Sequence, residues 1–109
     1  MNAPRDSSWD EYMEKVLKDP EEATAYLEAV MEMNDPAAML VALRHVARAH
    51  GMGEVTRRAN MGEKTLYQTL SEKGNPTLDT IIKVLRAVGL RLSVAPITAA
   101  ASEQEAHAA

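Results

Sequence analysis

The strongest structural signal in the chain lies at residues 55–70, which read VTRRANMGEKTLYQTL. Two short helical patterns, at 54–59 and 63–71, are separated by a turn at 60–62, which begins with Asn60. Asn tolerates the left-handed backbone that such a turn needs better than most residues do. The apolar residues that would hold the two helices together are Val55, Ala59, Met61, Leu66 and Leu70. This order predicts a helix-turn-helix motif, whose second helix enters the major groove of DNA.

The second helix of this motif has a polar side opposite Leu66 and Leu70. Gln can bond adenine through two hydrogen bonds, Lys can donate to guanine, and the Thr methyl can contact the thymine methyl. The residues expected to read bases are therefore Lys64, Thr65 and Gln68. The residues expected to bind phosphates around them are Arg57, Tyr67, Lys73 and Asn75. The alternative is that 63–71 is an ordinary surface helix of a bundle, with a solvated polar side.

Charge is distributed unevenly along the chain, whose net charge is -4. Residues 44–91 contain nine Lys and Arg against four Asp and Glu, a net charge of +5. The rest of the chain contains three bases and twelve acids, a net charge of -9. A basic middle with acidic flanks indicates a polyanionic partner for one part of the molecule. The alternative is a solvated surface of mixed charge.

Clear start and stop signals place three further helices. The Asp-Pro pairs at 19–20 and 35–36 put an N-cap carboxylate before a proline, which has no N–H to leave unpaired. Apolar residues recur at intervals of three and four after each pair. Thr77 is expected to cap the last helix, and Gly89 is expected to end it.

The two ends of the chain carry weaker signals. Residues 90–94 alternate apolar and polar, which predicts a short C-terminal strand that could pair with a second copy of the chain. The alternative is an extended segment packed on the last helix. Residues 1–18 are expected to be partly disordered, and the alanine-rich residues 96–109 to form a disordered tail. The DNA-binding domain is thus expected at 19–95, with its helix-turn-helix at 54–71.

The composition excludes several classes of protein. The chain has no cysteine, which excludes disulfides and Cys-based zinc sites and suits a reducing cytoplasm. No apolar stretch is long enough to span a membrane. His45 and His50 lie five residues apart, which is not the spacing of a metal-binding pair, and His107 lies in the tail. We therefore expect no catalytic residue, no metal and no cofactor, and a protein that is not an enzyme.

In combination, these segments resemble the Cro/C1-type (XRE) helix-turn-helix family and, more narrowly, the HigA-like addiction-module antidote proteins. The segments that carry the resemblance are GNPT at 74–77 with LDTIIKVLRAVGL at 78–90, DPEEA at 19–23 with YL at 26–27, DPA at 35–37 leading to Leu43, and LY at 66–67. The resemblance covers roughly residues 10–96, which is most of the chain.

The resemblance implies an all-α, five-helix, lambda-repressor-like DNA-binding domain that is usually dimeric and represses its own operon. It also implies that the protein neutralises a co-expressed small toxin, commonly a RelE-like ribonuclease. By position, Lys64, Thr65 and Gln68 match the family's base-reading residues, and 73–75 matches a phosphate-contacting loop. Met52 departs from the pattern, because many members of the family have a phosphate-binding Gln there.

The whole chain is therefore interpreted as a sequence-specific transcriptional repressor and antitoxin that binds a palindromic double-stranded operator as a homodimer. No motif identifies the toxin-binding surface. Segment 9–17 could dock on a basic toxin, because it places aromatic residues among acids; alternatively, Trp9 and Tyr12 cap the domain's own core. The alternative functions are a helical protein-binding module without DNA affinity and a prophage repressor without a toxin partner.

Overall fold

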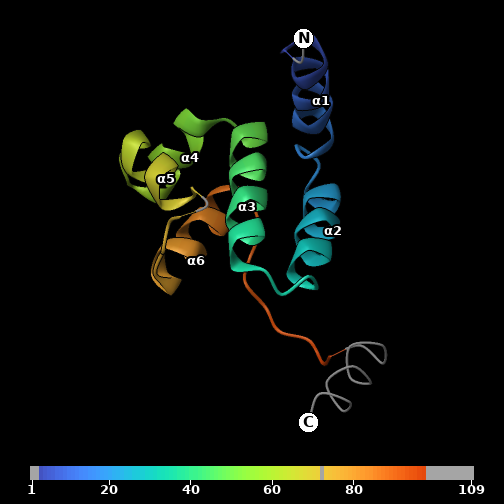
Figure 1. Ribbon diagram of the computed structural model, residues 1–109. Helices are drawn as coiled ribbons and strands as arrows, with labels where there is room; N and C mark the ends of the chain where they lie inside the picture. The colour runs from blue at the N-terminus through green and yellow to red at the C-terminus, as the bar shows by residue number, and fades with distance from the viewer. Residues whose placement is uncertain (1–2, 72, 98–109) are drawn as a thin grey trace.

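The computed structural model describes residues 3–71 and 73–97 of the 109-residue chain. This part is all helical, as predicted, and none of its residues forms a strand. Its helices, labelled in Figure 1, are α1 (Ala3–Val16), α2 (Pro20–Met31), α3 (Pro36–His50), α4 (Met52–Ala59), α5 (Glu63–Thr69) and α6 (Leu78–Ala87). No helix in the described ranges is both long enough and apolar enough to cross a membrane.

The expected number of helices was wrong, because the part described contains six rather than five. The additional helix is α1, which lies in the segment expected to be partly disordered. Its apolar residues recur at helical spacing, and two of them, Met13 and Val16, pack against the core. Leu17, directly after the helix, is 3% exposed. The N-terminal segment is therefore attached to the domain by its own apolar side.

The expected C-terminal strand is also a wrong prediction for the described residues. Residues 90–97 have no regular secondary structure. A strand needs a neighbouring strand for its backbone hydrogen bonds, and the described helical chain supplies none. Leu90 packs against the core, as the alternative interpretation expected, whereas Leu92 is 40% exposed. The disordered tail expected at 96–109 lies, from residue 98 onward, outside the described residues.

The predicted caps fix where α2, α3 and α6 begin. Asp19 Oδ1 accepts a hydrogen bond from a backbone N–H two residues on, at 3.0 Å. Asp35 Oδ1 accepts from the N–H groups two and three residues on, at 3.1 and 3.3 Å. Thr77 Oγ1 accepts from the N–H three residues on, at 3.2 Å. Each cap satisfies a donor that the first turn of a helix leaves unpaired. These three signals were confirmed.

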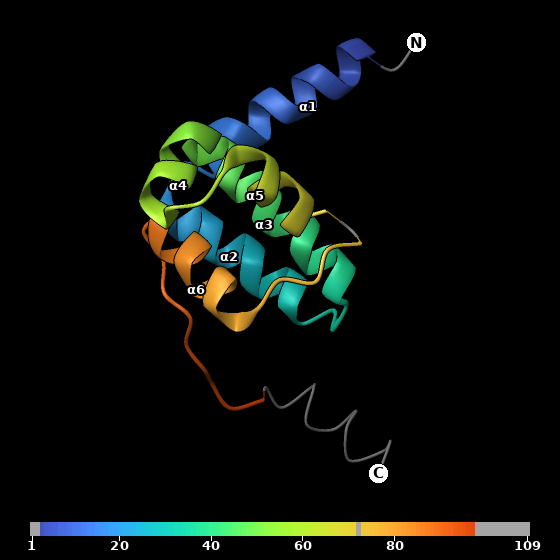
Figure 2. The same ribbon diagram turned by 90° about the vertical axis from the view of Figure 1, so that its left-hand side faces the viewer.

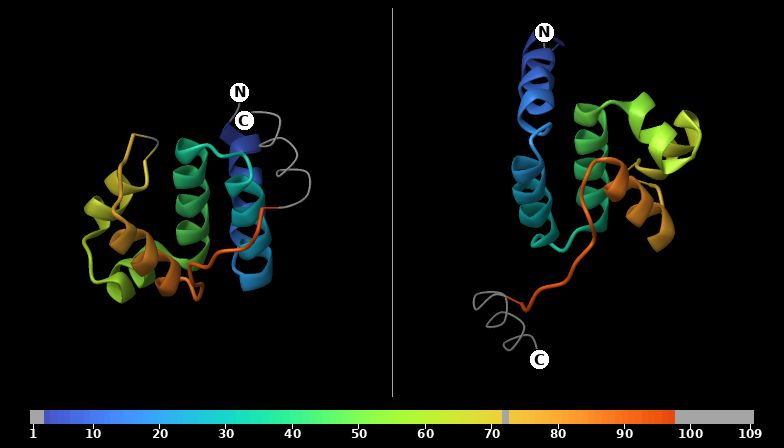
Figure 3. Two further views of the ribbon diagram at one scale, coloured as in Figure 1. Left: turned by 90° about the horizontal axis from the view of Figure 1, so that it is seen from below. Right: turned by 180° about the vertical axis from the view of Figure 1, so that it is seen from behind.

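Helix α3 stands at the centre of the molecule. In Figures 1 and 3, α1 and α2 lie on one side of it and α4 and α5 on the other, while α6 packs against α4. The buried residues of α3 are Leu40, Ala42, Leu43, Val46, Ala47 and Ala49. Three of these are alanines, whose small side chains let neighbouring helices approach closely. The molecule therefore has two sides, which α3 separates.

The core is aliphatic, as a sequence without Phe requires. Among the residues that the structure describes, every buried one is apolar. The largest fully buried side chains are Leu43, Val46, Val55, Leu66, Leu70 and Val84. They come from α3, from α4 and α5, from the residue that ends α5, and from α6, so the two short helices of the motif share the main core.

Tyr26 of α2 and His45 of α3 form a polar contact at the edge of the core. The Tyr26 hydroxyl and His45 Nδ1 are 2.8 Å apart and share a hydrogen bond, and the two rings stack with centroids 6.2 Å apart. Partial burial raises the pKa of the Tyr26 phenol. The phenol therefore remains protonated at neutral pH and can donate to the ring nitrogen. This contact adds to the apolar packing of Ala23 and Leu27 in holding α2 against α3.

Candidate nucleic-acid interface

Helix α5 has a polar side in solvent and an apolar side against the core. The exposed residues of this helix that were expected to contact DNA are Lys64, Thr65, Tyr67 and Gln68. Leu66, and Leu70 just after the helix, are both 0% exposed. In Figure 2, which looks onto this side of the molecule, α5 lies in front of α3. The predicted orientation of the helix is thereby confirmed.

The turn before α5 sets the direction of the helix. Asn60 has φ 57° and ψ 52°, the left-handed conformation that was predicted. The N–H of Met61 donates to the carbonyl of Thr56 at 3.1 Å, and the N–H of Asn60 donates to the carbonyl of Arg57 at 3.3 Å. These two bonds close a Schellman motif, which ends α4 sharply. Gly62 is then extended, and α5 begins at the next residue.

The C-terminal end of α5 is held by two side-chain donors. Arg44 on α3 donates from Nη1 to the carbonyl of Leu70 at 3.5 Å. The Ser71 hydroxyl donates to the carbonyl of Gln68 at 2.8 Å. Both donors bind carbonyls in the last turn, and the carbonyl of Gln68 also accepts from the backbone N–H of Ser71 at 3.3 Å. Sequence analysis missed Arg44, because its partner lies 26 residues away and no local pattern indicates the contact.

The loop after α5 folds back on the helix and leaves a hollow beside Gln68. The hollow has a volume of about 320 Å³ and is lined by Gln68, Thr69, Gly74, Asn75, Pro76, Thr77 and Thr80. Lys73 and Asn75, both expected to bind phosphate, are exposed in this loop. The hydroxyls of Thr77 and Thr80 are 3.1 Å apart and hydrogen-bonded to each other. Sequence analysis identified Thr77 only as the cap of the last helix and assigned neither Thr77 nor Thr80 to the site.

Arg57 is exposed on α4, but its guanidinium is already engaged. It forms an ion pair with Glu54, and Arg58 Nε binds the same carboxylate at 2.8 Å. Desolvation acts to raise the pKa of Glu54, but the hydrogen bond from Arg58 and the charge of Arg57 outweigh it and lower that pKa. A phosphate would have to compete with Glu54 for Arg57. The spacing of Glu54 three and four residues before the two arginines could have revealed this.

The predicted site residues are therefore distributed over three places. Gln68 and Asn75 line one hollow, while Lys64, Thr65 and Tyr67 are exposed on the same helix as Gln68. Lys73 is exposed in the loop, and Arg57 is paired on α4. Met52, the position that departs from the resembled family, packs against the core as a partly buried residue. The thioether of Met52 has no N–H to donate, so this side chain cannot replace a phosphate-binding Gln.

Comparison with known proteins identifies the family of the chain. Residues 8–96 match a family model described as "Probable addiction module antidote protein". A relative from Haemophilus influenzae, described as "Uncharacterized protein", is 36% identical over 78 residues, which cover 72% of this chain and 80% of the relative. No solved structure matches the chain. The chain belongs to the family of probable addiction module antidote proteins.

Proposed function

We propose that this antidote protein is also a sequence-specific DNA-binding repressor of its own operon. The observation that carries the proposal is the orientation of α5. Leu66 and Leu70 are 0% exposed behind it, while Lys64, Thr65 and Gln68 are exposed in front. The major groove of B-DNA is about 12 Å wide and admits one α-helix. A short helix anchored from behind and polar in front meets that requirement.

In this proposal, α4 and α5 form a Cro/C1-type helix-turn-helix within a lambda-repressor-like domain, and the protein is HigA-like. Gln68 pairs with adenine, Lys64 with guanine, and the methyl of Thr65 with thymine. Phosphates bind at Tyr67, Lys73 and Asn75, which fixes the register of the helix in the groove. Arg57 joins them when a phosphate displaces Glu54. What supports these roles is the exposure of each side chain on or beside α5.

The DNA-bound form is a homodimer on a near-palindromic operator. Two recognition helices related by a two-fold axis would lie about 34 Å apart, one turn of DNA. A groove of about 340 Å³ between α2 and residues 89–93 supports this part of the proposal. Beside it, Val94 is 98% exposed and Leu92 is 40% exposed. A second copy would remove this apolar surface from water.

The antidote family implies a toxin partner of some kind. The finer proposal is that this toxin is a RelE-like ribonuclease and that the two proteins meet in the bacterial cytoplasm. The antidote acts by binding and carries out no catalysis of its own. The resemblance of the sequence to HigA-like proteins supports this choice of toxin.

Gel-shift titrations with promoter DNA of the chain's own operon test the DNA-binding proposal. Gln68→Ala should lower the binding free energy for the operator by about 1–3 kcal/mol and relax the preference for one base at the position that Gln68 contacts. Lys73→Ala should weaken binding to all sequences alike, because phosphates carry no sequence information. Glu22→Ala, an exposed change on α2 outside the groove along residues 89–93, is the control and should leave binding unaltered. Equal losses on every sequence for both site variants would contradict the assigned roles.

The second candidate function is a helical protein-binding module without DNA affinity. The ion pairs of Glu54 with Arg57 and Arg58 favour it, because they reduce the positive charge available to DNA. A DNA-binding protein with several phosphate contacts loses affinity steeply between about 50 and 200 mM salt. Absence of any gel shift at the lower salt concentration would support this second function and reject the first.

A further inference from the structure

Two large aromatic side chains stand in solvent on α1. Trp9 is 58% exposed and Tyr12 is 59% exposed, with ring centroids 6.1 Å apart. The helix is anchored by other residues, since Met13 and Val16 pack against the core. The rings therefore do not cap the domain's core, which was the alternative interpretation of this segment. Exposed Trp and Tyr on a helix are typical of the central contacts of protein interfaces.

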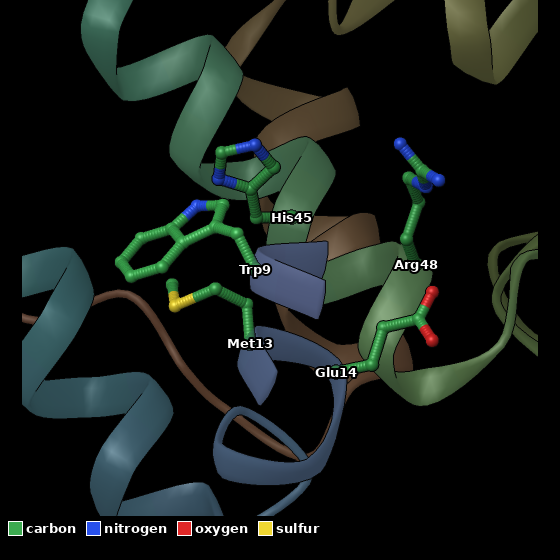
Figure 4. A pocket seen from close by; sticks show the side chains of 5 residues that line it. All are labelled: Trp9, Met13, Glu14, His45 and Arg48. Carbon is green, nitrogen blue, oxygen red and sulfur yellow. The ribbon is translucent and has the colours of Figure 1, made fainter. Parts of the chain in front are cut away.

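The recess beside the two rings is too small to hold a small-molecule ligand. Figure 4 shows Trp9, Met13 and Glu14 of α1 facing His45 and Arg48 of α3. These five residues line a recess of only about 20 Å³. Small-molecule sites usually have volumes of about 300–1,000 Å³. The recess can accept the tip of a partner's side chain, but it cannot enclose a ligand.

The charge of this half of the molecule indicates the chemistry of the partner. Residues 1–43 contain ten Asp and Glu against three Lys and Arg, a net charge of -7. Outside the groove along residues 89–93, the exposed carboxylates on α1 and α2 are those of Glu11, Glu21 and Glu22, and the exposed lysines between them are Lys15 and Lys18. Such a surface repels nucleic acid and attracts a cationic protein. Lys and Arg side chains of that protein could also bind over the faces of the exposed rings.

We infer that this surface, formed by Trp9 and Tyr12 with the carboxylates of Glu11, Glu21 and Glu22, is the docking site for a basic toxin. The inference rests on the proposed function, which supplies the toxin partner. In Figures 1 and 3, α1 and α5 lie on opposite sides of α3. A protein seated on α1 therefore leaves Lys64, Thr65 and Gln68 open to the groove. The acidic side faces the toxin, and the side with the exposed polar helix faces DNA.

Binding of the toxin encoded in the same module tests the docking site. The double variant Trp9→Ala, Tyr12→Ala should bind this toxin at least about 30-fold more weakly by calorimetry, because hot-spot aromatics have effects of this size. Glu11→Lys should also weaken binding, increasingly so at low salt. Met33→Ala is the matched control, since Met33 is 62% exposed in the turn after α2. Wild-type affinity in the double variant, with an unchanged melting temperature, would overturn the inference.

Adding the toxin to a preformed complex with promoter DNA tests whether toxin on this surface leaves α5 free for DNA. We expect a ternary species in a gel shift, and we expect the double variant to bind DNA as the wild type does. Release of DNA by the toxin would overturn the two-sided arrangement. Toxin binding without any DNA binding would reject the repressor function while leaving the docking site intact. Failure of the wild type to bind toxin would overturn the docking site and the toxin assignment together.

Discussion

Gly74 lies where the loop after α5 touches the end of that helix. A Cβ built on Gly74 would lie 2.1 Å from the carbonyl oxygen of Thr69 and 3.0 Å from that of Gln68. Both atoms belong to backbone, so they cannot turn aside as a side chain could. Gly74→Ala should therefore push the loop off α5 and destabilise the fold by about 1–3 kcal/mol. Thermal unfolding followed by circular dichroism measures this loss.

The control for this change is Gly53→Ala. A Cβ on Gly53 would meet nothing within 4 Å, and the residue lies in the first turn of α4. Alanine there should leave stability unchanged or raise it by up to about 0.5 kcal/mol, because alanine loses less backbone entropy than glycine and the first turn is less demanding than a helix interior. A Gly74→Ala variant that melts at or above the wild-type temperature would show that the loop does not pack on α5 as described.

Glu54 is the residue whose charge limits the basic surface of α4. The pKa of the Glu54 carboxyl is lower in the folded protein than in the unfolded chain. The ionised carboxylate therefore stabilises the fold at pH values above its unfolded-state pKa, and this contribution is lost as the pH falls through its folded-state pKa. Glu54→Gln should make stability less dependent on pH in this acidic range. It should also free Arg57 and Arg58, which raises DNA affinity and steepens its salt dependence. Denaturant unfolding at several pH values and gel shifts at several salt concentrations measure the two effects.

At the scale of single elements, the sequence correctly predicted the helix caps and the turn, which depend on interactions between residues close together in the chain. Asp19, Asp35 and Thr77 cap helices through bonds that span two or three residues, so the sequence reveals them. Asn60 adopts the left-handed turn for the same reason. The strand at 90–94 could not be decided in this way, because alternation fits any extended segment and pairing depends on a distant partner.

In the candidate site, too, the sequence predicted the local features and missed the tertiary contacts. Periodicity along α5 was enough to separate the buried Leu66 from the exposed Gln68. The contact of Arg44 with the end of α5 joins two helices that are distant in sequence, so no local pattern predicts it. The hollow beside Gln68 depends on how the loop folds back, which also lies beyond the reach of periodicity. Which side chains face outward is thus a local property, whereas the support behind them is tertiary.

The packing of α2 on α3 provides a prediction at this scale. Tyr26→Phe removes the hydrogen bond to His45 and should cost about 0.5–1.5 kcal/mol. The pKa of Tyr26 is raised, so the contribution of its phenol is present below the unfolded pKa and is lost as pH rises through the folded value. Wild-type stability should therefore fall more steeply than that of Tyr26→Phe in alkaline denaturant titrations. Tyr12→Phe, on the exposed side of α1, is the control and should unfold as the wild type does.

At the scale of the whole molecule, charge and shape divide the chain into two halves that meet at α3. Residues 1–43 have a net charge of -7, while residues 44–91 have a net charge of +5. This separation keeps the acidic helices away from any polyanion that contacts α5. A net charge of -4 for the whole chain therefore does not argue against DNA binding, because the local field at the binding side matters most at short range.

The proposed homodimer can be tested without disturbing the fold of one copy. Val94 is 98% exposed, so Val94→Asp changes almost no contact within the chain. In a dimer that covers the groove between α2 and residues 89–93, the same change would bring a carboxylate to the edge of an apolar contact, which is costly.

Sedimentation velocity should show Val94→Asp shifted toward the monomer at concentrations where the wild type is dimeric. Binding to a full palindrome should weaken, while binding to a half-site should remain. Val94→Thr keeps the branched shape and serves as the control. A Val94→Asp protein that stays dimeric would place the two-fold axis elsewhere on the molecule.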